Sequence, residues 1–279
     1  MHNILSVDFE EWYHPEYVKG NVSINKEERM QHSSKRALRL LEKHKANATF
    51  FVVGEIAEKH PSITEKIDEQ GHEIGFHGYY HEPLWKSNVE KLRREVEKFN
   101  SLFNGKCRGF RAPSFSLSNK TKWALDALEE AGYIYDSSIF PTKTPLYGVF
   151  GAPTKPYRIS HENVAKEEEN GILWEFPVLT YTWFGLKIPV GGGFYLRTIP
   201  LGIIERAIRK MNKCDQPAVI FVHPWELDPG TPKRKLGLYR SYVTYRNIEK
   251  TEKKLRHLLS NFSFVSVRNY MENQGFPFE

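Results

Sequence analysis

Short apolar segments alternate with helical segments along most of this chain, and this alternation most constrains what it can fold into. The first apolar segment covers residues 3–10 and precedes a helical pattern over residues 26–45. A second run at residues 48–54 precedes helical segments that reach Gly71. Repeated strand–helix units place successive strands parallel, because each helix returns the chain to the same end of the sheet. The sequence therefore predicts an α/β fold around a parallel sheet, open or closed.

The alternation continues to the end of the chain, with one interruption. Residues from about 141 to 198 are rich in proline, glycine and aromatic residues, with a short strand at 174–178, and this segment reads as an insertion. No linker-like composition divides the chain, so we expect a single domain over residues 1–279. The other predicted strands are 73–76, 107–111, 133–136, 218–222 and 262–267, and the other helices are 88–103, 118–132, 199–213 and 245–260.

Composition excludes several classes of protein. Hydrophobic residues make up 40% of the 279-residue chain, which is ample for a large core. The start lacks a signal-peptide pattern, no apolar run approaches a membrane span, and the two cysteines suit a reducing compartment, so we expect a cytoplasmic protein. The net charge is +6, yet no nucleic-acid-binding motif accompanies it. The basic residues at 233–246 predict contact with an anionic glycan, a sugar phosphate or an anionic membrane surface, or simply form a solvated loop.

Ionisable side chains follow several of the predicted strands. In a parallel sheet the carboxyl ends of the strands carry the functional groups. Acidic residues at 8, 10 and 11 end the first strand, and histidines follow two later strands. These residues are Asp8, Glu10, Glu11, His77, His81, Arg111 and His223.

The pair His77 and His81 has i, i+4 spacing, so both imidazoles face the same way if the segment forms one helical turn. Two imidazoles and a carboxylate suit zinc or a similar divalent ion. An isolated pair of this kind is equally compatible with structural or surface histidines. Asp8 and Glu10 have strand spacing and would point to the same side, where one could bind a metal and the other accept a proton from water. The alternative is that these acids cap the next element.

His223 follows the apolar run 218–222 and would emerge at the carboxyl end of a strand. A histidine there is either a general acid or a structural residue. The glycine run at 191–193 lacks the following Gly-Lys-Ser/Thr of a phosphate-binding loop and is interpreted as a tight turn.

The order of these motifs resembles that of the NodB-homology polysaccharide deacetylases, carbohydrate esterase family 4. Residues 48–61 together with Gly71–His81 resemble the family's second motif and its lead-in. Arg111-Ala-Pro113 resembles the third motif, Asp136 lies where a fourth is expected, and residues 222–226 resemble the fifth. The segments 135–141, 191–195, 223–226 and 264–268 are also similar to a bacterial subgroup associated with exopolysaccharide and lipid-linked glycan synthesis.

The resemblance implies a NodB-type distorted (β/α)7 barrel with an inserted elaboration. It implies that His77 and His81 are metal ligands, that Asp8 is the general base and that His223 is the general acid. Arg111 would hold Asp8 in its charged form, and Asp136 would orient or tune His223. The family's usual first motif has two adjacent aspartates, whereas this chain has Asp8-Phe-Glu-Glu11, so either Glu10 or Glu11 would be the third ligand. Gly78 replaces the usual hydroxyl residue of the histidine motif.

The implied activity is hydrolysis of the N-acetyl group of a sugar in a polysaccharide or a lipid-linked glycan, with a divalent metal, most simply Zn²⁺. Two alternatives are an allantoinase-like cyclic amidase on the same fold and a non-catalytic glycan-binding protein. Several aromatic residues lie near the motifs and could contact sugar rings or belong to the core. They are Tyr13, Tyr79, Tyr80, Trp85, Trp183 and Trp225.

Overall fold

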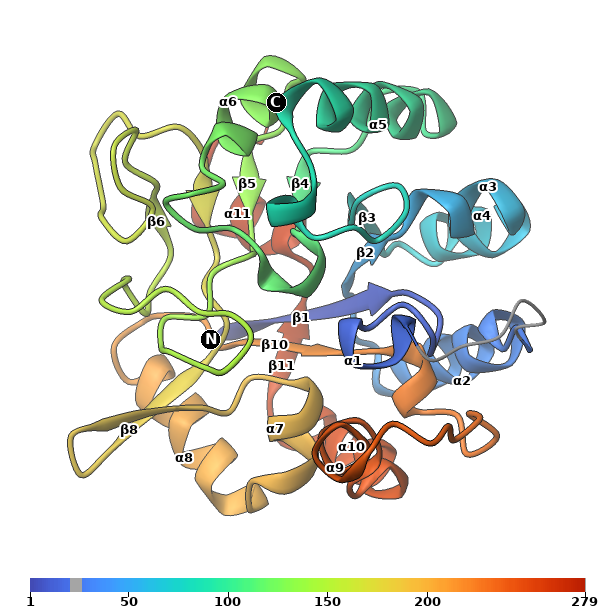
Figure 1. Ribbon diagram of the computed structural model, residues 1–279. Helices are drawn as coiled ribbons and strands as arrows, with labels where there is room; N and C mark the ends of the chain where they lie inside the picture. The colour runs from blue at the N-terminus through green and yellow to red at the C-terminus, as the bar shows by residue number, and fades with distance from the viewer. Residues whose placement is uncertain (21–26, 279) are drawn as a thin grey trace.

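A computed structural model describes residues 1–20 and 27–278 of the chain. Its centre, within these residues, is a sheet of nine strands in the order β10-β1-β2-β3-β4-β5-β7-β6, with β11 also paired to β1. Figure 1 shows helices arranged around the outside of this sheet. The strands are β1 (His2–Phe9), β2 (Thr49–Val52), β3 (Glu73–Phe76), β4 (Gly109–Phe110), β5 (Tyr135–Asp136), β6 (Tyr157–Arg158), β7 (Trp174–Glu175), β10 (Val219–Val222) and β11 (Ser263–Val265).

The seven strands from β10 to β7 run parallel, and within the described residues β6 alone is antiparallel to its neighbour in this sheet. Beyond β7 the chain turns back along β10. Leu179 N–H donates to the Val219 carbonyl at 2.9 Å, and Phe221 N–H donates to the Gly191 carbonyl at 2.8 Å. These bonds curl the sheet toward closure, so the predicted distorted barrel of seven parallel strands is confirmed.

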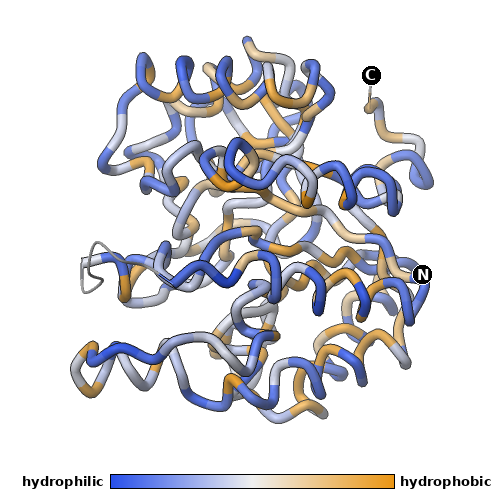
Figure 2. The backbone as a smooth tube through the Cα atoms, turned by 90° about the vertical axis from the view of Figure 1, so that its right-hand side faces the viewer, coloured by the Kyte–Doolittle hydropathy of each residue, from blue (hydrophilic) through white to orange (hydrophobic). Residues whose placement is uncertain are grey.

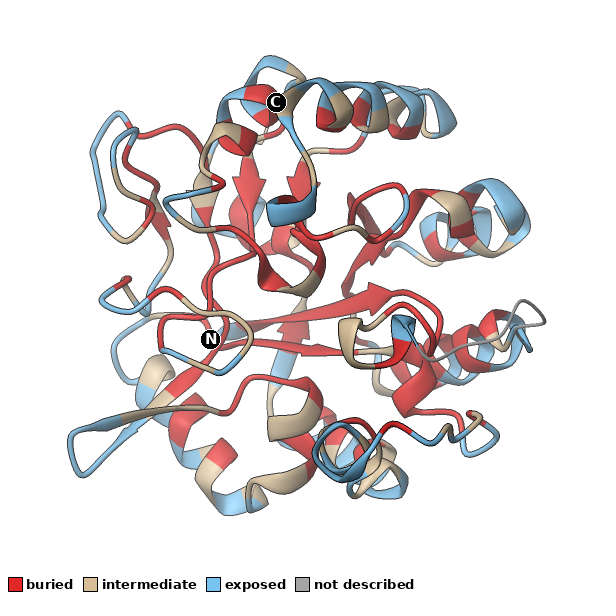
Figure 3. Ribbon diagram, in the orientation of Figure 1, coloured by how far each residue is buried: buried red, intermediate tan, exposed pale blue. Residues whose placement is uncertain are grey.

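The helices cover the outer face of the sheet because each has one apolar face. In α2 (Met30–His44) the buried residues include Ala37, Leu38 and Leu41, which recur at helical spacing. Figure 2 shows apolar and polar residues alternating along the helices, and Figure 3 shows the strands buried while the helices expose one side. The other outer helices are α3 (Gly54–Lys59), α4 (Pro61–Glu69), α5 (Val89–Leu102), α6 (Trp123–Glu130), α8 (Leu201–Asn212) and α10 (Thr251–Asn261).

A last helix, α11 (Val267–Gln274), covers the amino-terminal end of the barrel. Its first N–H groups donate to the Thr49 hydroxyl at 2.8 Å and to the Glu73 carboxylate at 2.9 Å, and these residues begin β2 and β3. Functional side chains therefore gather at the opposite end, where the strands finish. In the described part of the chain, no helix combines the length and the apolar character that a bilayer crossing requires.

The predicted insertion contains more structure than its sequence indicates. The strand predicted at 174–178 is the two-residue β7 of the main sheet, and a hairpin of β8 (Thr180–Trp183) and β9 (Leu186–Pro189) follows it. The glycine run bends against β10 and then begins α7 (Gly193–Thr198). A Cβ on Gly192 would lie 2.3 Å from the Phe221 carbonyl oxygen, so close backbone approach is what requires glycine here. The sequence reading also missed α9 (Leu238–Tyr245) and α11.

Candidate active site

Two carboxylates mark the carboxyl end of β1. Asp8 lies within the strand and Glu10 follows directly after it, and both side chains are 2% exposed. Both line a cavity of about 120 Å³. Phe9 points the other way, into the hydrophobic core. The predicted placement of Asp8 and Glu10 on one side of the chain is therefore confirmed, since side chains alternate along a strand.

His77 and His81 reach the same cavity by a bend and not by a helical turn. His77 N–H still bonds to the Val52 carbonyl at 3.0 Å, as a continuation of β3. Gly78 and His81 then adopt positive φ angles of 72° and 49°. The two rings lie 5.0 Å apart. The segment is therefore not a helical turn, but the two imidazoles converge.

Glycine at position 78 has a packing reason as well as a conformational one. A Cβ at Gly78 would lie 2.8 Å from Cγ of Pro113, the last residue of the Arg-Ala-Pro motif. The positive φ angle of Gly78 disfavours a side chain in addition. Glycine therefore replaces the family's usual hydroxyl residue at a position where the histidine motif and the Arg-Ala-Pro motif lie close together.

Glu10, His77 and His81 form a set of donor atoms suited to a divalent cation. Each offers one ligand atom, and these atoms lie within 4.8 Å of one another. Glu10 Oε2 and His81 Nε2 are 2.6 Å apart. His77 Nδ1 lies 2.7 Å from the Arg111 carbonyl, which can only accept, so Nδ1 carries the hydrogen and Nε2 keeps its lone pair. Burial acts to raise the pKa of Glu10, but the neighbouring His81 and His223 hold that pKa below its usual value. Two imidazoles and an ionised carboxylate fit such an ion.

Glu11, the alternative ligand, has a different task. Its Oε1 accepts hydrogen bonds from the backbone N–H groups of Arg29 and Met30, both at 2.7 Å. These N–H groups lie at the start of α2, where the side chain of the N-cap residue makes no capping hydrogen bond. Burial raises the pKa of Glu11 to about 7 in spite of these bonds. Glu10 is therefore the carboxylate of the donor set, and Glu11 caps a helix.

Replacing Glu11 with alanine should destabilise the protein without emptying the cation site. One buried and one part-buried N–H group would lose their acceptor, and the loss of a buried one costs about 1–3 kcal/mol. We expect the free energy of unfolding, measured by urea titration, to fall by roughly this amount. Bound metal per chain, measured by mass spectrometry, should stay at the wild-type value. Loss of metal in Glu11→Ala would contradict the assignment of Glu10.

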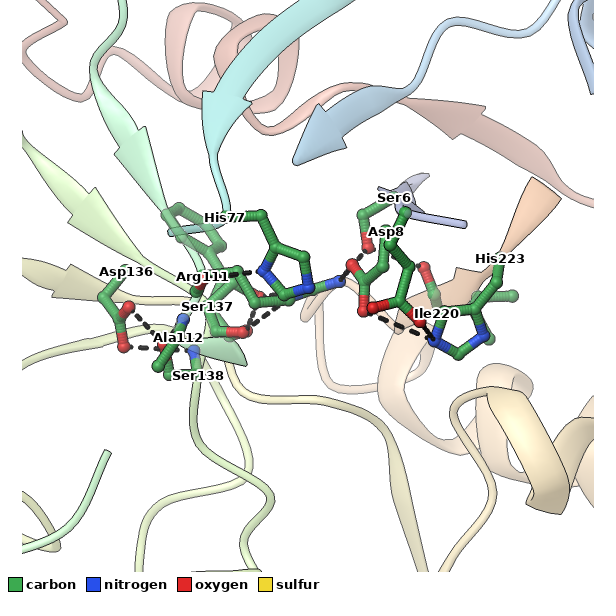
Figure 4. A network of polar contacts seen from close by, with 12 residues as sticks. Ser6, Asp8, His77, Arg111, Ala112, Asp136, Ser137, Ser138, Ile220 and His223 are labelled. Carbon is green, nitrogen blue, oxygen red and sulfur yellow. Dashed lines mark hydrogen bonds and ion pairs between the residues drawn. The ribbon is translucent and has the colours of Figure 1, made fainter. Parts of the chain in front are cut away.

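Arg111 is fully buried and pairs with Asp8. Its Nη1 donates to Asp8 Oδ1 at 2.6 Å and to the Ser6 hydroxyl at 2.8 Å. Its other donors bond to the carbonyl and hydroxyl of Ser137 at 2.8 and 2.7 Å. Figure 4 shows Asp8 between Arg111 and His223. The guanidinium compensates the charge of a carboxylate that burial would otherwise penalise, and it leaves Oδ2 of Asp8 free of Arg111.

His223 enters the cavity at the end of β10. Its Nε2 lies 3.5 Å from Glu10 Oε1 and 4.0 Å from Asp8 Oδ2. Its Nδ1 lies 2.9 Å from Glu226 Oε2, and the other Glu226 oxygen lies 2.7 Å from Arg197 Nε. Burial acts to lower the pKa of His223, but Glu226 and the carboxylates in the cavity raise it to about 9. His223 therefore carries a proton at neutral pH.

Asp136 does not orient His223, and this prediction was wrong. Asp136 accepts hydrogen bonds from the backbone N–H and the hydroxyl of Ser138, at 3.0 and 2.5 Å. Figure 4 shows it at the far end of the network, beyond Arg111 as seen from His223. Burial raises the pKa of Asp136, with Glu175 as its acidic neighbour. Its position supports the Arg111 loop, since Ser138 Oγ also accepts from Ala112 N–H at 2.7 Å.

Glu226 takes the place expected of Asp136 because of local chain geometry. The turn Pro224–Glu226 folds directly back on His223, so the carboxylate three residues later bonds to both the backbone N–H and the ring of His223. The spacing His-Pro-Trp-Glu was the sequence signal for this contact. Sequence reasoning also missed Arg197 and His14, whose ring stacks on His81 at 5.5 Å. Of the aromatic candidates, Trp225 is the one among the described residues that lines the cavity.

The geometry can now be compared with known proteins. Residues 19–135 match the family described as polysaccharide deacetylase, and residues 137–272 match a domain of unknown function, DUF3473. Residues 19–135 are therefore similar to a polysaccharide deacetylase domain. The sheet crosses the border between the two matches, because β5 ends at the border and β7 and β10 follow it. The second match supplies His223, Glu226 and Arg197 to the cavity that His77 and His81 of the first match also line.

Curated relatives match part of this chain. A peptidoglycan-N-acetylglucosamine deacetylase from Bacillus cereus is 38% identical over 91 residues, which cover 31% of this chain and 33% of that protein. A peptidoglycan deacetylase from Helicobacter pylori is 33% identical over 117 residues, 40% of this chain and 39% of that protein. The matched region thus spans about a third of the length of these relatives.

Solved structures share the fold of this chain. A Mycobacterium smegmatis structure assigned to the polysaccharide deacetylases aligns with a TM-score of 0.60 and 18% identity, over 99% of this chain and 93% of that one. A carbohydrate esterase family 4 pseudoenzyme from Bacillus anthracis aligns with a TM-score of 0.50 and 14% identity, over 96% of this chain and 64% of that one. Because one of these neighbours is a pseudoenzyme, the fold by itself does not decide activity.

Proposed function

We propose that this chain is a divalent-cation-dependent N-deacetylase that hydrolyses the acetamide of an N-acetylated sugar in a polysaccharide or glycan precursor. The observation that carries the proposal is the position of Asp8. Asp8 is paired with Arg111 and faces His223, directly beside the donor set of Glu10, His77 and His81. Each part of an amide hydrolase is therefore present in one cavity.

Hydrolysis of an amide needs an activated water, stabilisation of the carbonyl oxygen as it gains negative charge, and a proton for the leaving nitrogen. When bound, a divalent cation, with Zn²⁺ preferred by the donor set, would supply Lewis-acid polarisation of the carbonyl and acidify the attacking water. Glu10, His77 and His81 would hold it.

The chain's own residues move the protons. Asp8 is held by Arg111 through Oδ1, so its Oδ2 can accept the proton of the attacking water. His223 has its Nδ1 engaged by Glu226, so Nε2–H faces the cavity and can protonate the leaving nitrogen. Because this imidazolium supplies a proton, the nitrogen leaves as a neutral amine and not as an anion.

Several backbone N–H groups near the cavity already have hydrogen-bond acceptors, so they are not available to stabilise the carbonyl oxygen of the substrate. Tyr79 N–H donates to Glu95 at 3.0 Å, and Arg111 N–H and Ala112 N–H donate to Phe76 and Ser138. We therefore assign the oxyanion contact to the backbone N–H groups of residues 80–82, next to Tyr79. These N–H groups would act together with the cation.

The test measures acetate release together with metal content. Purified protein is assayed on N-acetylated oligosaccharides, a polymer and a lipid-linked acetamido sugar, before and after chelation and after zinc readdition. The proposal expects metal near one per chain and acetate release that chelation abolishes and zinc restores. Turnover of a cyclic amide without metal would favour an allantoinase-like amidase. Glycan binding without any turnover in the metal-loaded protein would favour a binding protein.

Replacing Glu226 with glutamine should impair the protonation step. The carboxylate that raises the pKa of His223 would be lost, so His223 would give up its proton at lower pH. We expect kcat at neutral pH to fall by roughly 10- to 100-fold and the alkaline limb of the pH–rate profile to move to lower pH. The pH dependence of acetate release checks both effects. An unchanged alkaline limb would show that His223 does not supply the proton.

A further inference from the structure

A positively charged segment lies between Asp228 and Glu249, and the chemistry proposed above does not use its charge. The segment contains five basic residues and no acidic residue, whereas the whole chain has 40 basic and 34 acidic residues. We call residues 233–246 the basic segment. Its basic residues are Lys233, Arg234, Lys235, Arg240 and Arg246, and all of them except Arg234 are exposed. The positive charge of the chain is therefore concentrated here, on the surface.

Apolar side chains are exposed among these charges. In α9, Leu238 is 95% exposed, Tyr239 is 56% exposed and Tyr242 is 52% exposed. These three residues lie on one side of the helix, because successive helical residues are rotated by about 100°. Thr244, on the opposite side, is buried. The basic segment thus presents a leucine and two aromatic rings to a partner outside the chain.

The exposed side of α9 has a fixed position beside the catalytic cavity. Arg197 donates to the carbonyl oxygens of Val243 and Thr244 at 2.9 and 3.0 Å, and it also pairs with Glu226. Val243 and Thr244 line the cavity themselves. Figure 1 shows α9 next to α7, and Figure 3 shows most of α9 exposed. A partner bound to the exposed side of α9 would therefore lie at the edge of the cavity.

The combination of charges and apolar groups fits an anionic lipid bilayer. Lysine and arginine near a bilayer are attracted to its anionic head groups, and tyrosine and leucine enter the boundary between head groups and acyl chains. A soluble polyanion would use the same charges but would leave Leu238 in water. A protein partner is less suited to this surface, because protein interfaces are depleted of lysine.

We propose that the basic segment is a peripheral docking site for the surface of an anionic lipid bilayer. Leu238 and Tyr239 would enter the head-group region, and the exposed basic residues beside them would contact lipid phosphates. The edge of the catalytic cavity would then lie at the bilayer surface. This inference goes beyond the proposed function and does not depend on it, because docking needs neither the cation nor turnover.

The test measures sedimentation of the full chain with vesicles of phosphatidylcholine, with and without phosphatidylglycerol. We expect binding to the anionic vesicles and little binding to the neutral ones. The double variant Lys233→Gln with Lys235→Gln should bind the anionic vesicles roughly 10- to 30-fold more weakly. Leu238→Ser should bind them roughly three- to tenfold more weakly, because less apolar surface enters the bilayer. Both changes are at exposed positions, so the fold should be unaffected.

Matched controls come from the amino-terminal end of the barrel. Lys210 and Lys213 are exposed at the end of α8, just before β10 begins, and Leu102 is 39% exposed at the end of α5. The double variant Lys210→Gln with Lys213→Gln removes the same net charge, and Leu102→Ser removes the same side chain. Both controls should bind the anionic vesicles like the wild type. Equal losses in the controls would mean that net charge or general hydrophobicity governs binding, and the docking site would be wrong.

Soluble dextran sulfate distinguishes a bilayer from a polyanion. Leu238→Ser should bind dextran sulfate like the wild type while binding anionic vesicles more weakly. If Leu238→Ser binds both like the wild type and the lysine variant loses both, the segment is a polyanion site and the proposal is overturned. A wild type that does not bind anionic vesicles would overturn it as well.

Acetate release from a water-soluble N-acetylated oligosaccharide keeps this inference separate from the proposed function. The lysine variant and Leu238→Ser should keep the wild-type kcat and KM on this substrate. If the wild type binds vesicles as expected but releases no acetate, the docking site stands and the proposed activity fails. If acetate is released but anionic vesicles are not bound, the activity stands and the docking site is wrong.

Discussion

Asp8→Asn is expected to lower kcat for acetate release by roughly 10²–10⁴-fold, the usual contribution of a general base. Asparagine has nearly the same shape, but its amide cannot accept a proton from water. Asp8 lies outside the donor set of Glu10, His77 and His81, so bound metal per chain should change little. Kinetics of acetate release and elemental analysis of the same preparation check both parts.

The same substitution has a cost in stability that must be separated from its effect on turnover. Arg111 is fully buried, and its charge would lose its compensating partner. Removal of one member of a buried ion pair costs about 3–5 kcal/mol. Assays are therefore run well below the unfolding temperature of the variant, and its fold is checked by circular dichroism.

Asp136→Asn is the matched control for Asp8→Asn. Asp136 is an equally buried aspartate behind Arg111, but its oxygens bond to Ser138 and it does not line the cavity. We expect kcat in Asp136→Asn to stay within a few-fold of the wild type. Comparable losses of kcat in the two variants would mean that the loss in Asp8→Asn reflects disturbance of the Arg111 network and not loss of a base.

The sequence predicted the parallel sheet from its periodicity, and the family resemblance predicted that the sheet forms a distorted barrel. The apolar runs at β1, β2 and β10 are buried on both faces, which makes them visible as continuous hydrophobic segments. Chemistry at strand ends then follows from topology, and Asp8, His77 and His223 meet as expected. The two-residue strand β6 gave no comparable signal, whereas β7 was predicted as part of a strand at 174–178.

Contacts that depend on backbone bends were not predictable in this way. The pairing of Glu226 with His223 arises in a single turn after β10, whereas the expectation for Asp136 came from family order. The choice between Glu10 and Glu11 depends on where α2 begins relative to β1, because the start of α2 takes one of the two carboxylates as its cap. The position of α2 relative to β1 cannot be read from spacing along the chain.

Glu10→Ala and His77→Ala are expected to abolish both bound metal and turnover. Both variants should also lose the stabilisation of the folded state that bound metal provides. A ligand that binds only the folded state stabilises it by about 2.7 kcal/mol at one hundred times its dissociation constant. Zinc added to the chelated wild type should therefore raise the melting temperature measured by calorimetry. Neither variant should respond, because each lacks one of the three donors that converge on the site.

Glu11→Ala is the control that separates loss of the cation site from loss of a buried carboxylate. It removes a neighbouring buried carboxylate by the same substitution, so a general loss of negative charge or packing would appear in both glutamate variants. We expect Glu11→Ala to melt at a lower temperature than the wild type, to gain stability from zinc by the same increment, and to keep chelator-sensitive turnover. A zinc response that survives in Glu10→Ala but disappears in Glu11→Ala would reverse the two assignments. A response that survives in His77→Ala would place the ion outside this donor set, and the role of Asp8 beside it would then lose its basis.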